Sequence, residues 1–316
     1  MLKSLIVLLS FYTSFVVTNE ANNKCVDIDS LNEPVGEYFA KNVVPKLEGL
    51  HKGDAGKIVV VGGSSEYTGA PYFAAISALK AGADLVYVLT TASAAPVIKS
   101  YSPDLIVHPT LSPSTFTAIE TVLRKADVVV IGPGLGRTSE TVHLTANILN
   151  TCRTLRKPLV IDADGLYVIS KDVTLVKNYP SPGIIMTPNH LEAKYLKKAV
   201  EAMGYKQNWQ KYWGPHVSVL VKGASDSFYG NTTWEISDGG SQRRAGGQGD
   251  ILSGSLGTFF GWAIKANVCA SVPTFAVARL TRACNEIAFA AHGRSMTASD
   301  MLLQMHAAFE KCFGVV

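Results

Sequence analysis

Cysteine is scarce in this sequence. The 316 residues include five widely spaced cysteines that form no CxxC pair, namely Cys25, Cys152, Cys269, Cys284 and Cys312. A zinc site, which normally uses such pairs, is therefore not expected. The odd number and the wide spacing also argue against a disulfide framework, so we interpret the cysteines mostly as buried thiols.

Charge is also sparse. Charged residues make up 17% of the sequence, and the net charge is +4. This balance is too weak to predict a nucleic-acid-binding surface, which requires a dense basic patch. The conspicuous basic pair Arg243-Arg244 lies beside a glycine cluster, where it suits a local anion. The hydrophobic share of 47% instead predicts a compact globular protein.

The apolar run at residues 5–17 is too short to span a bilayer comfortably, so no stable membrane insertion is expected. Lys3 precedes this run and polar residues follow it, which is typical of a secretory signal peptide. The Arg-rich pattern of a mitochondrial presequence is absent. We predict a signal peptide or other targeting leader over residues 1–18, with the secretory pathway or endoplasmic reticulum as its destination. In that pathway Asn231 would be a glycosylation acceptor. An uncleaved start and a mitochondrial or cytosolic location remain alternatives.

Two familiar nucleotide-binding motifs are missing. No GxxxxGK[ST] pattern occurs, which excludes a Walker P-loop. The glycine run at residues 132–136 reads GPGLG, and its proline fits a dinucleotide-binding GxGxxG motif poorly. This run is either a strand-end turn that approaches a ligand or a plain tight turn.

What the sequence does contain is an alternation of short apolar runs and helix-like segments. We predict strands at residues 57–61, 84–90, 127–131, 159–161, 184–186 and 217–221, with an edge strand at 234–236. We predict helices at residues 72–81, 251–265, 274–292 and 301–313. Continuous apolar strands are typical of a parallel sheet with both faces covered, which predicts an α/β fold. We expect one domain over residues 43–316, preceded by a polar segment at 19–42 that is a tail or a first short helix.

Unusual residues follow the predicted strands at their carboxyl ends. These positions carry Gly62-Gly63, Gly132-Pro133-Gly134, Asp162, Asn189 and Lys222-Gly223. Ligands of open α/β sheets bind at the carboxyl ends of the strands. We therefore expect the functional site at this edge of the sheet.

The segment GGQGDILSG, residues 246–254, places four glycines and one acid at the start of a predicted helix. Free amides at a helix N-terminus attract anions, and glycines let an anion come close. Asp250 is either a base that takes a proton from a hydroxyl group beside this anion site or a helix cap. A cap alone does not require so many glycines, so the sequence favours the base.

Other polar motifs remain ambiguous. Asn189 and Glu192 share a first helical turn, where they either orient a metal-bound water or substrate group or act as a cap. Asp162 and Asp164 either help to hold Mg²⁺ through water or cap the following helix. Lys222 either meets a phosphate or nucleotide ribose or belongs to a turn.

Taken together, these motifs resemble a known family. GKIVVVGGSSEYTGAPYFAAISALKAGADLVYV, IGPGLGR, VIDADGL, TPNHLEA, VKGASD, SQRRAGGQGDILSGSLG and HGRSMTASDML occur in the order seen in the NAD(P)H-hydrate dehydratases, the YjeF C-terminal-like family. The resemblance covers about residues 43–313. It implies a ribokinase-like three-layer α/β/α domain with a central, mostly parallel sheet. The SQRRAGGQGD form resembles the eukaryotic members, which use ATP, so ATP and Mg²⁺ are expected.

The resemblance implies repair of the S-form of hydrated NADH and NADPH. ATP phosphorylates the C6 hydroxyl of the hydrate, phosphate leaves, and NAD(P)H, ADP and phosphate result. By matching position, Asp250 is implied as the base. The ATP site is implied at Lys222, Gly223, Ala224, Ser225, Asp226, Gly240, Ser241, Gln242, Arg243, Arg244, Ala245, Gly246, Gly247, Gln248 and Gly249. The hydrate site is implied at Gly136, Asn189, His190, Leu191, Glu192, Ala193, Lys194, Tyr195 and Asp250. The loop at residues 66–69 is expected to border the substrate. No metal ligand is assigned.

Two other functions use the same features. A ribokinase-like small-molecule kinase would employ Asp250 and the glycine cluster equally well, but it would release a phosphorylated product. A nucleotide-binding carrier would keep the fold without turnover, although the presence of both base and glycines argues against it. The sequence does not determine the oligomeric state, and a homo-oligomer is one possibility.

Overall fold

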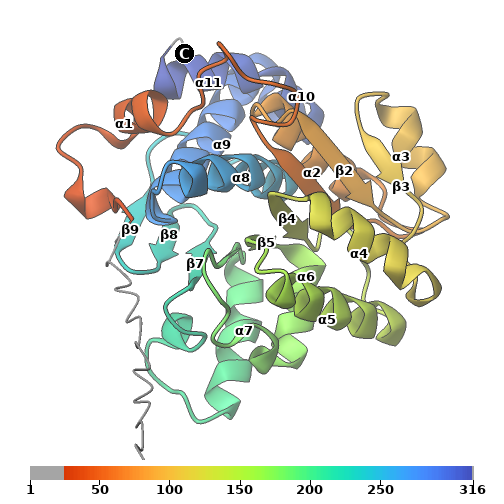
Figure 1. Cartoon of the computed structure of the whole chain (residues 1–316). Coiled ribbons are helices and arrows are strands. Elements are labelled where there is room, and N and C mark those ends of the chain that lie inside the picture. The colour runs from red at the N-terminus through yellow and green to blue at the C-terminus, as the bar shows by residue number, and fades with distance from the viewer. Residues whose placement is uncertain (1–24, 315–316) are drawn as a thin grey trace, which may run out of the picture.

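The computed structural model describes residues 25–314, and within them nine strands form one sheet (Figure 1). The strand order is β3-β2-β1-β4-β5-β6-β7-β8-β9. Strands β1 to β7 pair in parallel, whereas β7–β8 and β8–β9 pair antiparallel. The predicted α/β fold with a mostly parallel central sheet is therefore confirmed.

The seven predicted strands are all present, with small shifts at their ends. Two further strands, β3 and β8, were not predicted. β3 is only three residues long and lies at the sheet edge, and β8 alternates buried and half-buried residues within a polar stretch. The strands are β1 (Lys57–Val61), β2 (Leu85–Leu89), β3 (Ile106–His108), β4 (Val128–Ile131), β5 (Leu159–Ile161), β6 (Ile184–Met186), β7 (Val217–Val221), β8 (Asp226–Tyr229) and β9 (Thr233–Ile236).

Helices cover both faces of the sheet, because successive strand residues point to opposite sides. In β1, Ile58 and Val60 join one buried cluster with α2, α8 and α9, while Val59 and Val61 join the other with α4 to α7. Figure 1 shows these two layers on either side of the strands. The helices are α1 (Val35–Asn42), α2 (Gly69–Lys80), α3 (Ala95–Tyr101), α4 (Phe116–Lys125), α5 (Ser139–Thr154), α6 (Ala163–Lys171), α7 (His190–Ala202), α8 (Gln248–Lys265), α9 (Ser271–His292), α10 (Ala298–Leu303) and α11 (Met305–Phe313).

The prediction of a single C-terminal helix at residues 301–313 is wrong. The structure has two helices there, α10 and α11, which meet at Gln304. Gln304 has a ψ angle of 1°, which is outside the α-helical range. A capping box between Thr297 and Asp300 begins α10 before the predicted start. The capping box therefore sets the start of α10, and the backbone angle at Gln304 separates it from α11.

The interpretation of the cysteines needs one correction. Cys25 and Cys269 form a disulfide across 244 residues of sequence. The pairing arises because Val26 forms a β-bridge with Val268, which brings the two thiols side by side. Sequence spacing could not reveal a contact that the tertiary fold creates. Cys152 and Cys284 are buried thiols as expected, and Cys312 is half-buried.

The polar segment at residues 19–42 contributes to the core where the structure describes it. Helix α1 fulfils the expectation of a first short helix, and its Phe39 is completely buried. The Phe39 ring packs against Phe259 at 4.6 Å and Phe313 at 5.1 Å between ring centroids. The predicted leader at residues 1–18 lies outside the described residues. Between residues 25 and 314, no helix is both long and apolar enough to cross a membrane.

Helix α8 approaches its neighbours unusually closely. A methyl group added at Gly254 would meet the carbonyl oxygen of Ala74 at 1.9 Å and Ser77 Oγ at 2.5 Å. Both partners belong to α2, so the two helices pack with almost no side chain between them at this point. This contact explains the glycine inside an otherwise apolar helix.

We predict that Gly254→Ala destabilises the protein by about 1–3 kcal/mol or more, because the added methyl group forces α2 and α8 apart. Gly261→Ala is the matched control on the same helix, where the new group would meet only Val128 Cγ2 at 3.3 Å. Its gain in helix propensity offsets this mild contact, so we expect a change below about 1 kcal/mol. Chemical denaturation measures both. Equal stability of the two variants would contradict the prediction.

Candidate active site

A cavity of 540 Å³ opens at the carboxyl end of the parallel strands, where α7, α8 and α9 meet the β7–β8 turn. It has walls from four separate parts of the chain. The lining residues are Asn189, His190, Leu191, Lys222, Gly223, Asp226, Gly240, Ser241, Arg244, Ala245, Gln248, Gly249, Leu252, Thr281, Arg282 and Asn285. The cavity lies at the carboxyl edge of the sheet, where the residues that follow the strands predicted the functional site.

The structure brings most of the expected ATP-site residues to this cavity, but not all of them. Nine of the fifteen line it, namely Lys222, Gly223, Asp226, Gly240, Ser241, Arg244, Ala245, Gln248 and Gly249. Ala224, Ser225, Gln242, Arg243, Gly246 and Gly247 belong to the same two loops without lining the cavity. These six residues shape the loops rather than the cavity wall.

The glycine cluster forms the beginning of α8. Gly247 is the N-cap residue with φ 91°, a conformation that favours glycine, and a methyl group there would meet Ala298 Cβ at 2.7 Å. The helix starts at Gln248, three residues before the predicted start at Ile251. The first-turn residues Gln248 and Gly249 line the cavity, so the free amides of this turn lie at its wall.

Asp250 is the third residue of α8 and is partly buried. The cap position belongs to Gly247, so the alternative that Asp250 is the N-cap is wrong. No side-chain hydrogen bond joins Asp250 to another residue of the described chain. Burial, together with the nearby charge of Asp162, raises the pKa of Asp250 to about 7, although Lys222 acts in the opposite direction. A carboxyl group with this pKa can exchange protons near neutral pH.

Lys222 forms a buried ion pair with Asp162. The Lys222 Nζ atom lies 2.6 Å from Asp162 Oδ1, and the Thr187 hydroxyl also donates to this oxygen, at 2.9 Å. Burial alone would lower the pKa of Lys222, but the carboxylates of Asp162 and Glu192 outweigh it and raise the pKa. A methyl group on Gly249 would be 3.0 Å from Lys222 Nζ, so the pair lies directly under the first turn of α8. Lys222 is therefore surrounded by carboxylates.

The helix-cap alternative for Asp162 and Asp164 needs correction, whereas their role in holding Mg²⁺ through water stays a prediction. Asp162 occupies the N-cap position of α6, but its side chain makes no capping bond and pairs with Lys222 instead. Asp164 accepts hydrogen bonds from the Gly136 amide at 2.9 Å and from Arg137 Nε at 2.7 Å. Among residues 25–314, no cluster of three or more His, Cys, Asp or Glu side chains is arranged to hold a metal ion.

The cap interpretation of Asn189 is confirmed. Its Oδ1 atom accepts from the amides of Leu191 and Glu192, and Glu192 Oε2 accepts from the Asn189 amide. This capping box begins α7 beside the cavity. Burial, followed by the charge of Asp162, raises the pKa of Glu192, so its carboxyl group belongs to the same electrostatic cluster as Asp250.

The expected hydrate-site residues are only partly brought together. Asn189, His190 and Leu191 line the cavity, and His190 is exposed. Further along α7, Ala193 is buried in the core, whereas Lys194 and Tyr195 are exposed outside the cavity. The remaining residues of this set, Gly136, Glu192 and Asp250, do not line the cavity. The Gly136 amide donates to Asp164. Glu192 and Asp250 both interact electrostatically with Asp162 and Lys222.

The loop expected to border the substrate lies against the glycine turn after β4. A methyl group on Gly134 would meet Tyr67 Cβ at 2.8 Å, and Gly136 faces Ser64 at 3.8 Å. Residues 132–136 therefore form a turn that lies close to another part of the chain, and the alternative that this turn approaches a ligand stays a prediction. The partner in the described chain is the loop after β1.

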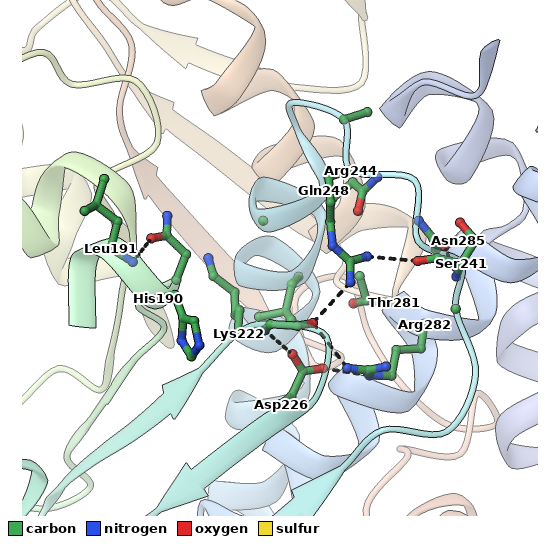
Figure 2. Close-up of a pocket in the computed structure, with 16 residues that line it drawn as sticks. His190, Leu191, Lys222, Asp226, Ser241, Arg244, Gln248, Thr281, Arg282 and Asn285 are labelled. Atoms are coloured by element: carbon green, nitrogen blue, oxygen red, sulfur yellow. Dashed lines mark hydrogen bonds and ion pairs between the residues drawn. The ribbon is translucent and has the colours of Figure 1, made fainter. Parts of the chain in front are cut away.

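Four cavity residues were missed by the sequence analysis: Leu252, Thr281, Arg282 and Asn285. Three of them come from α9, about 30 positions after the glycine cluster. In Figure 2, Arg282 points from α9 toward Asp226, while Arg244 approaches the same turn from the α8 side. A basic and a polar residue within an apolar helix are the only signal that could have indicated them.

The arrangement suits an anionic ligand. Helix α8 offers amides, and Arg244 contributes a guanidinium group. Each of these donors is typical of a phosphate site. The carboxyl group of Asp250 belongs to the same helical turn.

Comparison with known proteins agrees with this chemistry. A family model described as NAD(P)H-hydrate dehydratase matches residues 58–306. An ATP-dependent (S)-NAD(P)H-hydrate dehydratase of Aedes aegypti is 50% identical over 282 residues, covering 87% of this chain and 84% of that protein. The human protein of the same name is 44% identical over 293 residues, with coverage of 87% and 84%.

Solved structures show the same fold. A ribokinase-like superfamily protein from Enterococcus faecalis matches with a TM-score of 0.71 and 18% identity, covering 89% of this chain and 95% of that one. The ADP/ATP-dependent NAD(P)H-hydrate dehydratase of Bacillus subtilis, co-crystallised with ATP/Mg²⁺, matches with a TM-score of 0.66 and 19% identity, covering 87% and 97%. The fold is thus ribokinase-like, and the extent of the family match shows that the chain belongs to the NAD(P)H-hydrate dehydratase family.

Proposed function

We propose that this protein is an ATP-dependent (S)-NAD(P)H-hydrate dehydratase that returns the hydrated cofactors NADHX and NADPHX to NADH and NADPH. The names of its close relatives support this assignment. The observation that carries it is the position of Asp250, a carboxyl group with a pKa of about 7 in the first turn of a helix whose amides line a cavity. This is a base placed beside a phosphate site.

The reaction proceeds in two stages. Asp250 takes the proton of the C6 hydroxyl group as its oxygen attacks the γ-phosphorus atom of ATP, and ADP leaves. The C6–O bond of the phosphate ester then breaks with loss of phosphate. A proton leaves the adjacent ring carbon, which forms the double bond of the dihydronicotinamide. The products are NAD(P)H, ADP and phosphate, and the net change in the cofactor is the loss of water.

Charge stabilisation supplies the other part of the catalysis. The amides of Gln248 and Gly249 offer donors to the transferring phosphoryl group, and Lys222 lies beneath them. Arg244 donates to the Ser241 carbonyl at 2.9 Å, which places its guanidinium group over the cavity for the ATP phosphates. Mg²⁺ bound to ATP would neutralise phosphate charge, and the Asn189–Glu192 pair at the start of α7 would orient its water.

A direct assay tests the proposal. The purified protein receives enzymatically hydrated NADH, ATP and Mg²⁺, and the reduced-nicotinamide absorbance and free phosphate are followed together. We expect both to rise in equal amounts. Consumption of ATP with phosphate retained on an organic product would instead favour a small-molecule kinase of the same fold.

We predict that Asp250→Asn lowers turnover by roughly a hundredfold or more, because the amide cannot accept the hydroxyl proton. ATP affinity should change little, since the α8 amides and Arg244 remain. Asp29→Asn, at an exposed position in the N-terminal segment, is the control and should leave turnover unchanged. Steady-state kinetics and equilibrium ATP binding measure the two effects, and normal turnover by Asp250→Asn would remove the residue from its proposed role.

The raised pKa of Asp250 predicts a pH dependence. The base must be deprotonated, so kcat/KM for the hydrate should rise with pH and level off above about 7, the pKa of this carboxyl group. Lys222 lowers this pKa, so Lys222→Met should move the midpoint to higher pH. The profile is recorded at saturating ATP, and Asp250→Asn shows which part of it comes from ATP itself. A midpoint near the ordinary aspartate value, unchanged in Lys222→Met, would contradict the assignment.

Arg244→Ala should weaken ATP binding more than hydrate binding, because the side chain faces the cavity from the loop that precedes α8. The loss of one charged donor predicts an increase of about tenfold in the Kd for ATP. Arg124→Ala, on α4 in the opposite helical layer, is the matched control. Calorimetric titration with each ligand measures the difference, and a larger effect on the hydrate would reverse the proposed orientation.

A further inference from the structure

All donor atoms of Arg282 are directed at one small region. Its Nε atom lies 2.8 Å from Asp226 Oδ2 at the start of β8. Its Nη2 atom donates to the carbonyls of Gly223 at 3.4 Å and Ala224 at 2.8 Å, and its Nη1 atom to those of Ser237 at 3.3 Å and Gly239 at 3.2 Å. One side chain from α9 therefore makes five contacts with two separate loops.

These two loops are opposite parts of the cavity wall. Gly223 and Asp226 belong to the β7–β8 turn, whereas Gly240 and Ser241 belong to the loop between β9 and α8, immediately after the Arg282 acceptors. Apart from Arg282, the Arg244 side chain links the same pair, donating to Ser241 and, at 3.5 Å, to Gly223. Arg244 is largely exposed, so Arg282 provides the stronger constraint on their separation.

Burial makes the Arg282 contacts strong and specific. The side chains of Arg282 and Asp226 are only 11% and 8% exposed, so their ion pair is shielded from water. Asp226 Oδ1 in turn accepts from the Gly223 amide at 2.9 Å, which closes the turn around the guanidinium group. A lysine has one nitrogen and no planar fork, so it cannot reach carbonyls on both loops while it pairs with Asp226.

Asn285, about one turn further along α9, acts on the same loop. Its Oδ1 atom accepts a hydrogen bond from the Ser241 amide, and its Nδ2 atom donates to the Arg243 carbonyl at 3.4 Å. Its side chain is buried and lines the cavity. Two neighbouring residues of α9 thus hold the loop that carries Ser241, Arg243 and Arg244 (Figure 2).

We propose that Arg282 is a positioning residue for ATP: it fixes the distance between the β7–β8 turn and the β9–α8 loop, and thereby sets the shape of the nucleotide site. The inference rests on the proposed function, because that function places ATP in this cavity. Arg282 also lines the cavity, but its donors are already engaged with the protein, so it acts through the two loops.

The test compares two substitutions on one helix. Arg282→Lys keeps the charge that Asp226 requires, which protects folding, but it loses the contacts to the loops. Arg279→Lys is the matched control, since Arg279 is exposed one turn earlier and faces the groove beside α1 and α11. Calorimetry with ATP and Mg²⁺, steady-state kinetics and thermal unfolding are measured for the wild type and both variants.

We expect Arg282→Lys to raise both the Kd and the KM for ATP by about tenfold or more, because loops that hold the binding-competent arrangement only about one tenth of the time raise the apparent Kd by that factor. The KM for the hydrate and the kcat at saturating ATP should change by less than about threefold, a small part of that effect. Arg279→Lys should match the wild type in all of these values. Addition of guanidinium ions at millimolar concentration to Arg282→Ala should restore ATP affinity, whereas ammonium ions at equal ionic strength should not.

The opposite results separate the two proposals. If Arg282→Lys binds ATP as the wild type does while its melting temperature falls, Arg282 is only a structural brace and the inference is overturned. If the wild type binds ATP but does not convert the hydrate, the proposed function fails, whereas a selective loss of ATP affinity in Arg282→Lys still supports the positioning role. A wild-type protein that binds no ATP overturns both.

Discussion

The close approach of α8 to the sheet and to α2 is the contact on which the site depends. At Gly254 the helix rests on the backbone of α2, and at Gly257 a methyl group would meet Val130 Cγ2 of β4 at 2.8 Å. Side chains at these positions would hold the helix away from the strands. Because the helix lies so low, its first turn reaches the ion pair at the ends of β5 and β7. The free amides, Asp250 and Lys222 consequently share one small volume.

The balance of charges in this volume determines the pKa of Asp250. Lys222 is a single cation among the carboxylates of Asp162, Glu192 and Asp250. It pairs closely with Asp162, so its charge compensates Asp250 only in part. Burial and the remaining negative charge then raise the pKa of Asp250 to about 7. The same residues that hold the ends of the strands together thus keep a carboxyl group poised to exchange a proton.

The side of the cavity at which we propose that ATP binds is built differently from the side that carries Asp250. The Asp250 side uses the ends of parallel strands, while the other side uses the antiparallel hairpin of β8 and β9 and the helix α9. Irregular loops form much of this wall, and their conformation depends on main-chain carbonyls that accept from Arg282. Buried charged donors stabilise loops that regular hydrogen-bond ladders do not reach.

By itself the sequence determined the α/β class, most strands and the edge of the sheet at which the site forms. Apolar runs of β-branched residues identify buried parallel strands, and glycine and polar residues after them identify the carboxyl ends. The motif from Gly246 to Gly254 also identified Asp250 and the helix N-terminus beside it. These features are local, so periodicity and residue type are sufficient to recognise them.

Only the tertiary structure decided which distant groups meet. The pairing of Lys222 with Asp162, the disulfide between Cys25 and Cys269, and the contacts of Arg282 all join residues more than 40 positions apart. Such contacts depend on strand order and helix packing, which local patterns do not specify. The partners of Arg282 are mostly backbone carbonyls, which every residue type carries, so no sequence pattern marks them.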